Sequence, residues 1–94
     1  MNLPKVFNYG RYSSDNYGAH TLAFETPNGV FYFSYDTMVA FRGKTGLHVI
    51  KNYWGTTTGK HLNWIDGGRK ENREDKESFK KNFALCFGAE MEIE

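Results

Sequence analysis

The sequence predicts an α+β domain, in which an antiparallel sheet of four to five strands precedes one short and one longer helix. Two apolar runs alternate with polar residues on either side of Pro27-Asn28-Gly29, which indicates a β-hairpin. Further along the chain the apolar period changes from two to about 3.6, which indicates helices. Strands first and helices last are typical of this fold class, and we expect both helices to pack on one face of the sheet.

The first hairpin is predicted from residues 21–35. Phe24 in the first run and Phe31 and Phe33 in the second occupy alternate positions, as the pleat of a half-buried strand requires. Proline sets the first torsion of the connecting turn, and asparagine or glycine accepts the positive φ that follows. The preceding residues 8–20 show no clear period, so we expect an irregular segment or a bulged strand there.

A second hairpin and a short helix follow. Residues 37–42 and 47–54 are rich in β-branched and aromatic residues and flank Gly43-Lys44-Thr45-Gly46, so we predict that they pair as strands. Residues 57–66 fit a helix that a threonine side chain could cap at its start. Gly67-Gly68 could end this helix in left-handed geometry.

The longer helix is predicted near residues 74–87, after a charged stretch at 69–77 that we interpret as a solvated linker. We expect its apolar stripe to pack against the aromatic side of the sheet. The stripe consists of Phe79, Phe83, Cys86 and Phe87.

Size and composition favour a single domain that spans residues 1–94. A chain of 94 residues is too short for a second independent core. Its formal net charge of +1 gives no overall attraction to nucleic acid or to an anionic membrane. One cysteine excludes an internal disulfide, and no apolar run approaches the roughly 20 residues of a membrane helix. With no sign of a secretion signal, we expect a cytoplasmic protein that is monomeric or homodimeric.

The stretch from Gly55 to His61, GTTTGKH, is similar to a phosphate-binding loop but departs from its pattern. A nucleotide-binding loop has four residues between its glycines and a serine or threonine after the lysine, whereas three residues and His61 stand here. We therefore exclude an NTPase. Thr57, Thr58 and Lys60 at the helix start could still bind an anion. The alternative, which we favour, is that the threonines only cap the helix.

No residue pattern indicates a metal site or a cofactor. The histidines His20, His48 and His61 lack the spacings of zinc motifs. A site formed by His20, His61, Asp66 or Cys86 meeting in space remains an alternative. His48 alternates with apolar neighbours and is predicted to be a surface or cross-strand side chain.

Catalytic residues are not indicated either. Cys86 would need an exposed, electropositive setting to act as a nucleophile, but it falls between Phe83 and Phe87 and is predicted to pack in the core. Asp36 and Asp66 are not paired for acid–base chemistry, and we assign them to a turn and to a helix end. We therefore expect that the protein is not an enzyme.

Two groups of residues have the composition of a protein-binding surface. Tyrosines near the N-terminus alternate with serine, glycine and asparagine and offer rigid contact area. They could instead stack on unpaired bases or cover the sheet. Acidic residues outnumber basic ones from residue 70 onward, and they could bind a basic partner or only keep the chain soluble. The predicted partner-binding residues are Tyr9, Arg11, Tyr12, Tyr17, Glu71, Glu74 and Asp75.

Three stretches, NYGAHTLAF, FYFSYDTMVAF and WGTTTGKHLNWIDGG, resemble a family of small proteins found in bacteriophages and in bacterial genomes that carry mobile elements. The resemblance covers roughly residues 8–70 and extends loosely through the last helix. The family has no established reaction, so the resemblance implies no catalytic residue. It implies a context, because small cytosolic phage proteins are often inhibitors of a host or defence machine, anti-CRISPR proteins among them.

The leading functional hypothesis is a non-enzymatic, protein-binding inhibitor of phage type. It would be an anti-CRISPR or other anti-defence protein that blocks a bacterial nuclease by covering part of its surface. Its partner would be a protein, such as a CRISPR-associated nuclease, and direct nucleic-acid binding is not expected. The alternative is a small protein that binds single-stranded nucleic acid, for which a basic groove is needed.

Overall fold

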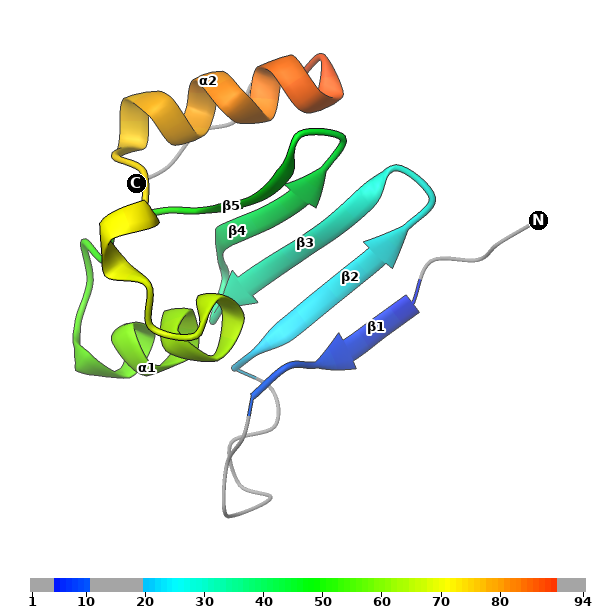
Figure 1. Cartoon of the computed structure of the whole chain (residues 1–94). Coiled ribbons are helices and arrows are strands. Elements are labelled where there is room, and N and C mark those ends of the chain that lie inside the picture. The colour runs from blue at the N-terminus through cyan, green and yellow to red at the C-terminus, as the bar shows by residue number, and fades with distance from the viewer. Residues whose placement is uncertain (1–4, 11–19, 90–94) are drawn as a thin grey trace.

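The computed structural model describes residues 5–10 and 20–89 (Figure 1). Its strands are β1 (Lys5–Asn8), β2 (Leu22–Thr26), β3 (Gly29–Ser34), β4 (Thr37–Gly43) and β5 (Gly46–Val49). The helices are α1 (Thr56–Asp66), the short 3-10 helix η2 (Lys70–Asn72) and α2 (Lys76–Phe87). The strands form one sheet in chain order, and each pairs antiparallel with the next. The predicted α+β class, with its helices after the sheet, is confirmed.

Both predicted hairpins are present, although the strand predicted over residues 47–54 is wrong beyond Val49, where β5 ends. β2 and β3 meet at a turn where Thr26 opposes Gly29, and β4 and β5 meet where Gly43 opposes Gly46. An added Cβ at Gly29 would lie 2.5 Å from the carbonyl oxygen of Arg42. Only glycine therefore allows β3 and β4 to approach this closely at that end of the sheet.

One face of the sheet carries the aromatic residues and is covered by α2. Phe31 opposes Phe24 on β2 and Phe41 on β4, and Phe41 opposes His48 on β5, so these side chains share a face. The ring centroid of Phe41 lies 5.1 Å from that of Phe79 on α2. Phe41 and Phe79 are both fully buried, so this contact lies at the centre of the core and confirms the predicted packing of the stripe.

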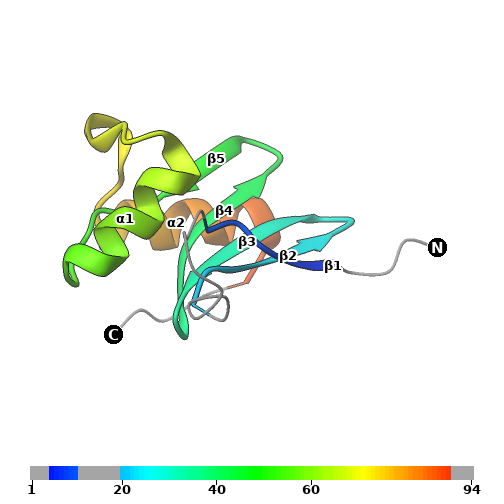
Figure 2. The ribbon, with the colours of Figure 1, turned by 90° about the horizontal axis from the view of Figure 1, so that it is seen from below.

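The opposite face of the sheet is covered by α1. Ser34 is next to Phe33 along β3 and points to the other face. Its Oγ lies 2.7 Å from Nδ1 of His61 and 3.1 Å from Oγ1 of Thr58, both on α1. Figure 2 shows α1 on one side of the sheet, where it contacts β3, β4 and β5. The expectation that both helices pack on one face is therefore wrong.

The physical reason lies in β4, which is apolar on both of its faces. Val39, Ala40 and Phe41 are consecutive and fully buried, so the strand leaves no polar face for solvent. Leu62 of α1 and Phe79 of α2 belong to the same buried cluster as these three residues. A strand buried on both faces needs cover on both, and this separates the two helices.

α1 begins without the predicted threonine cap. Its N-cap residue is Gly55, and no side-chain capping bond is present. Thr57 is exposed, whereas Thr58 is buried and contacts Ser34 on the sheet. The capping prediction is therefore wrong for this helix start. The predicted glycine end is confirmed, because Gly67 adopts a left-handed conformation with φ of 69°.

The charged segment before α2 is not a solvated linker throughout. The backbone of Glu74 pairs in parallel with Ile50, just beyond the end of β5. The Glu74 N–H donates to the Val49 carbonyl, and the Lys51 N–H donates to the Glu74 carbonyl, both at 2.8 Å. Arg73 is only 7% exposed. The solvated-linker prediction is therefore wrong for Arg73 and Glu74, which fasten the segment to the sheet.

We expect Thr58→Ala to lower the free energy of unfolding by about 1 kcal/mol, because it removes the buried hydrogen bond to Ser34. Thr57→Ala is the matched control, and its effect should stay within about 0.5 kcal/mol because that side chain is exposed and caps nothing. Urea denaturation followed by circular dichroism measures both changes. A larger loss in the Thr57 variant would restore the capping role that the contacts argue against.

Candidate functional site

A pocket of about 440 Å³ lies where the first half of α1 meets the segments before and after that helix. This volume falls within the roughly 300–1,000 Å³ of small-ligand sites. Four of the lining residues are basic and none is acidic. The lining consists of Lys51, Asn52, Thr56, Gly59, Lys60, Asn63, Lys70 and Arg73.

Asn52 forms one wall of the pocket and also builds the turn that opens α1. Its Nδ2 donates to the Gly55 carbonyl at 3.0 Å, and its Oδ1 accepts from the Trp54 N–H at 2.9 Å. A Cβ on Gly59 would lie 3.1 Å from Nδ2 of Asn52, which is closer than side chains usually pack. Glycine at this helical position therefore leaves room for Asn52 to rest against α1.

Arg73 joins the far side of the pocket to the end of α1. Its Nε donates to Oδ2 of Asp66 at 2.8 Å, and its Nη2 donates to Oδ1 of Asp66 at 3.0 Å and to Oδ1 of Asn63 at 2.9 Å. Burial alone would raise the pKa of Asp66, but the hydrogen bonds from Arg73 and from the Gly68 N–H outweigh it and hold that pKa below its ordinary value. The charge of Arg73 is thus matched inside the protein.

Three lysines bring their positive charges to the pocket from three different segments. Lys51, Lys60 and Lys70 are all exposed, and the two ion pairs among the described residues involve none of them. The hydrogen bonds from Ser78 lower the pKa of Asp75, and the charge of Lys51 lowers it further. The pocket therefore presents a positive potential to a ligand.

The start of α1 adds partial positive charge at the same place. Thr56 is the first residue of the helix and lines the pocket. The first turn contains no acidic side chain and makes no side-chain capping bond. Free N–H groups and the helix dipole favour anions at such a position. Together with the lysines and the asparagine amides, they form a surface rich in hydrogen-bond donors.

Two large aromatic side chains stand exposed in the chain segment that borders the pocket. Tyr53 is 45% exposed and Trp54 is 37% exposed, and both follow Asn52 directly. Their ring centroids lie 6.1 Å apart at an interplanar angle of 87°, so the two rings do not stack face to face. The Tyr53 hydroxyl accepts from the Lys76 N–H at 3.2 Å, and Nζ of Lys76 lies 4.8 Å from the ring centroid. Tyr53 is therefore held against the start of α2.

Only one of the three residues predicted to bind an anion lines the pocket. Lys60 does so, whereas Thr57 and Thr58 do not. Sequence reasoning missed Lys51 and Lys70, which lie on the segments before and after α1. The available signal was a lysine on either side of a predicted short helix, but nothing in the local pattern indicates that these lysines meet.

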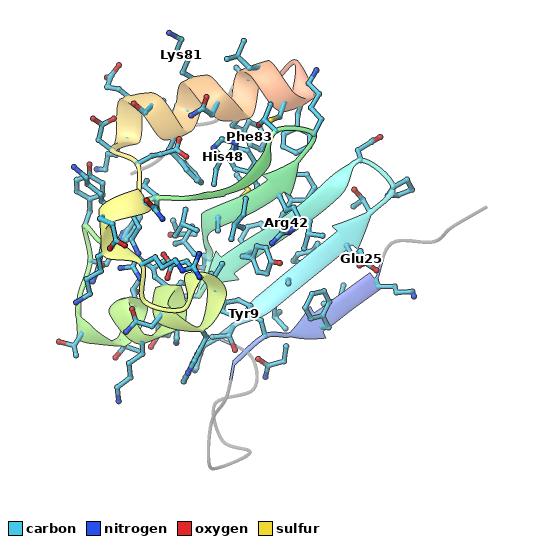
Figure 3. The ribbon with its side chains drawn as sticks, viewed as in Figure 1. Tyr9, Glu25, Arg42, His48, Lys81 and Phe83 are labelled. Atoms are coloured by element: carbon cyan, nitrogen blue, oxygen red, sulfur yellow. The ribbon has the colours of Figure 1, made fainter. Side chains whose placement is uncertain are left out.

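The predicted tyrosine surface is described only in part. The Tyr9 hydroxyl donates to the Phe33 carbonyl at 2.7 Å, and its ring packs edge to face against Tyr32 at 5.5 Å between centroids. Tyr9 therefore covers the end of the sheet near α1 (Figure 3). Arg11, Tyr12 and Tyr17 lie outside the described residues, so their role in partner binding stays a prediction.

The predicted acidic surface is partly engaged within the fold. The Asp75 carboxylate caps α2 by accepting from the Ser78 N–H at 2.8 Å. Glu74 accepts from Asn82 and contacts His48. Glu71 is exposed. Two of the three carboxylates thus have structural partners, and a role in partner binding for this group stays a prediction.

A chain of hydrogen bonds runs from Glu74 to the longer helix. Nδ1 of His48 lies 2.6 Å from Oε2 of Glu74, and its Nε2 lies 2.8 Å from Oγ1 of Thr45. The same Thr45 oxygen lies 3.1 Å from Sγ of Cys86, which is partly buried. A carboxylate, an imidazole and a hydroxyl occur in this order in nucleophile triads. Here they tie the β4–β5 turn to α2, so we assign them a structural role (Figure 3).

No metal centre is formed by the residues that the structure describes. Among them, no group of three or more His, Cys, Asp or Glu side chains is placed to hold a metal ion. His61 is fully buried and bonded to Ser34, and burial, followed by the charge of His20, lowers its pKa. The imidazole of His61 is thus part of the interface between α1 and the sheet.

We expect Asp66→Asn to lower the free energy of unfolding at pH 7 by about 3 kcal/mol, because it leaves the buried Arg73 guanidinium without its counter-charge. Since the pKa of Asp66 is lowered on folding, its contribution is complete above its ordinary pKa of about 3.9 and is lost as the pH falls through the lower folded value. As the pH falls below about 4, the free energy of unfolding should therefore decrease less in the variant than in the wild type.

Urea denaturation at a series of pH values measures this difference, with Asp36→Asn at an exposed turn as the matched control. The control should follow the wild-type profile. If Asp66→Asn is as stable as the wild type at pH 7, the pair does not anchor the segment around Arg73.

No helix in the described part of the chain is long and apolar enough to cross a membrane.

Comparisons with known proteins place the chain in a family but give it no function. No curated protein and no solved structure matches the chain. A family model matches residues 4–81, which include the whole sheet, α1 and every residue of the pocket. The family description states no activity, so the phage context and the anti-CRISPR role stay predictions. The chain belongs to this family of unknown function, DUF8033.

Proposed function

We propose that the protein is a non-enzymatic binding protein that holds a phosphate-bearing ligand in the basic pocket at the start of α1. One observation carries the proposal: Lys51, Lys60 and Lys70 converge on one cavity from three segments, and no acidic residue lines it. Like charges repel, so a fold gathers three lysines only at some cost in stability. A bound anion would offset that cost.

Phosphate fits this donor set better than an isolated carboxylate does. Lysine ammonium groups bind phosphate as point charges, while a carboxylate is matched best by the two-pronged fork of arginine. The one arginine of the pocket, Arg73, already directs its fork at Asp66. A cavity of about 440 Å³ also exceeds what one phosphate group needs, which favours a ligand that carries more than the phosphate.

Binding without chemistry is supported by what lines the cavity. The lining includes no carboxylate, imidazole or thiol, and so lacks the groups most often used for acid–base or nucleophilic catalysis. Exposed lysine contacts contribute roughly 0.2–1 kcal/mol each. At the upper end of these ranges, three such contacts and the helix start together contribute about 4 kcal/mol, so about 1 mM is the tightest Kd expected for inorganic phosphate.

The inhibitor function predicted from the sequence has less support in the site. Glu74 and Asp75 of its acidic surface are bonded within the fold, and the hydroxyl of Tyr9 is bonded to β3. The pocket, by contrast, is basic and open to a ligand. Blocking a bacterial nuclease thus remains a prediction that capture of such a nuclease would test, and anion binding is the function that we favour.

Phosphate should raise the melting temperature of the protein at constant ionic strength. At about ten times its Kd, binding adds about 1.4 kcal/mol to stability, which corresponds to a shift of several degrees for a domain of this size. The shift should fall by at least half in Lys60→Ala and in Lys51→Ala. Differential scanning fluorimetry with sodium phosphate against sodium chloride measures it.

Lys81→Ala is the matched control, because Lys81 lies on α2 and points away from the sheet (Figure 3). It should keep the full wild-type shift. No phosphate-specific shift in the wild type, or an equal shift in Lys60→Ala, would mean that the pocket is not the binding site.

A further inference from the structure

We infer that the ligand is a single-stranded nucleic acid whose backbone crosses the basic pocket while its bases stack on the exposed rings of Tyr53 and Trp54. The inference rests on the proposed function and names the class of ligand. It combines the basic pocket with the exposed aromatic pair, which are adjacent in the chain. Lys51 and Asn52 line the pocket, Tyr53 and Trp54 follow them, and Thr56 lines the pocket again.

The position of Trp54 is controlled by a residue of the pocket. The Trp54 N–H donates to Oδ1 of Asn52, while Nδ2 of the same Asn52 holds the Gly55 carbonyl. The aromatic segment is therefore a tight turn pinned by a pocket side chain. Trp54 and the adjacent Tyr53 are both exposed on this turn and together form an aromatic surface, the kind of feature that marks a binding site more than a single exposed ring does. A base that follows a bound phosphate would cover this surface.

The geometry of the two rings leaves an aromatic face for a base. Because Tyr53 and Trp54 meet edge to face with their centroids 6.1 Å apart, the contact covers at most one face of one of the two rings. Tyr53 has the ammonium of Lys76 over its ring, which adds a fourth lysine beside the aromatic pair. Stacking of a base on an aromatic side chain contributes about 1–3 kcal/mol and depends little on the base. Trp54 is the larger platform and carries most of the stacking in this proposal.

The same features favour a single strand over the other phosphate-bearing polymers. A duplex hides the faces of its bases, so it could use the lysines but not the rings. Phosphopeptides are recognised mainly by arginine clusters, and here Arg73 is committed to Asp66. A basic groove interleaved with exposed aromatic rings is the combination that single-stranded nucleic acids require.

The number of free lysines fixes the expected salt dependence. Three lysines that each neutralise one phosphate predict a slope of about −2 for log K against log salt, because each contact on a single strand contributes about −0.7. Lys70→Ala should make the slope shallower by about 0.7. Lys81→Ala, on the far side of α2, should leave it unchanged.

The experiment is a fluorescence titration with an oligothymidylate of about 12 nucleotides, within the roughly 4–16 nucleotides of single-strand sites. The chain has two tryptophans, so Trp64→Phe leaves Trp54 as the only indole. This variant should be quenched on binding, and Trp54→Phe should respond weakly. Trp54→Ala should lower the affinity about tenfold, and Trp54→Phe should recover part of that loss. Circular dichroism confirms that each variant is folded.

Each alternative result has a separate meaning. If phosphate binds in the pocket but the oligonucleotide binds no more tightly than phosphate and leaves Trp54 unquenched, the inference fails and the proposed function stands. If neither binds, both fail. Equal affinity for the matching DNA duplex, or tighter binding of a phosphoserine peptide, overturns the inference as well. Oligonucleotide binding that is unaffected by Lys51→Ala and Lys60→Ala would place the oligonucleotide site elsewhere and overturn the inference, while the phosphate shift would still decide the proposed function.

Discussion

The bidentate pair between Arg73 and Asp66 is the interaction on which the pocket depends. The two side chains are 4% and 8% exposed, so each charge would cost several kcal/mol if it were left without the other. The pair therefore adds little net stability but decides whether the segment docks. The segment before α2 packs on the end of α1 only with the pair formed, because an unpaired buried charge would be too costly. When it docks, Lys70 is brought to the same cavity as Lys60.

The next residue completes the placement. The backbone of Glu74 pairs with Ile50, so the chain immediately before Lys51 is fixed to the chain immediately after Arg73. Lys51 and Lys70 are thus held near each other through backbone hydrogen bonds and one buried ion pair, without any contact between the lysines themselves. Gathering like charges in this way works against stability, and departures of that kind from purely stabilising choices are found most often where a protein binds something.

The elements of the fold could be predicted from local sequence, whereas the contacts between distant segments could not. Turn residues and apolar periods were sufficient for the hairpins at residues 21–35 and 37–49 and for both long helices. The face covered by α1 was predicted wrongly, although the unbroken apolar run from Val39 to Phe41 indicates a strand buried on both sides. The lysines of the pocket are brought together by the Arg73–Asp66 pair and by the pairing of Glu74 with Ile50, both of which involve a segment that was predicted to be a solvated linker. No periodicity or motif in the sequence indicates that Arg73 and Asp66 form an ion pair.

Net charge is a poor guide to binding in a chain of this size. The formal charge of +1 argued against nucleic acid, but that argument holds only when charges are spread evenly. Asp66 is bonded to Arg73, Glu74 to Asn82, and Asp75 to the start of α2. Of these acids only Asp66 is paired with an arginine or lysine, and Asp75 also interacts with Lys51, but the lysines of the pocket are exposed and take part in neither ion pair among the described residues. At about 0.1 M salt the Debye length is about 10 Å, while the molecule extends 38 Å along its longest axis. A ligand at the pocket therefore responds chiefly to the lysines around it. Acidic side chains on the far side of the molecule lower the net charge of the chain but not the positive potential at the pocket.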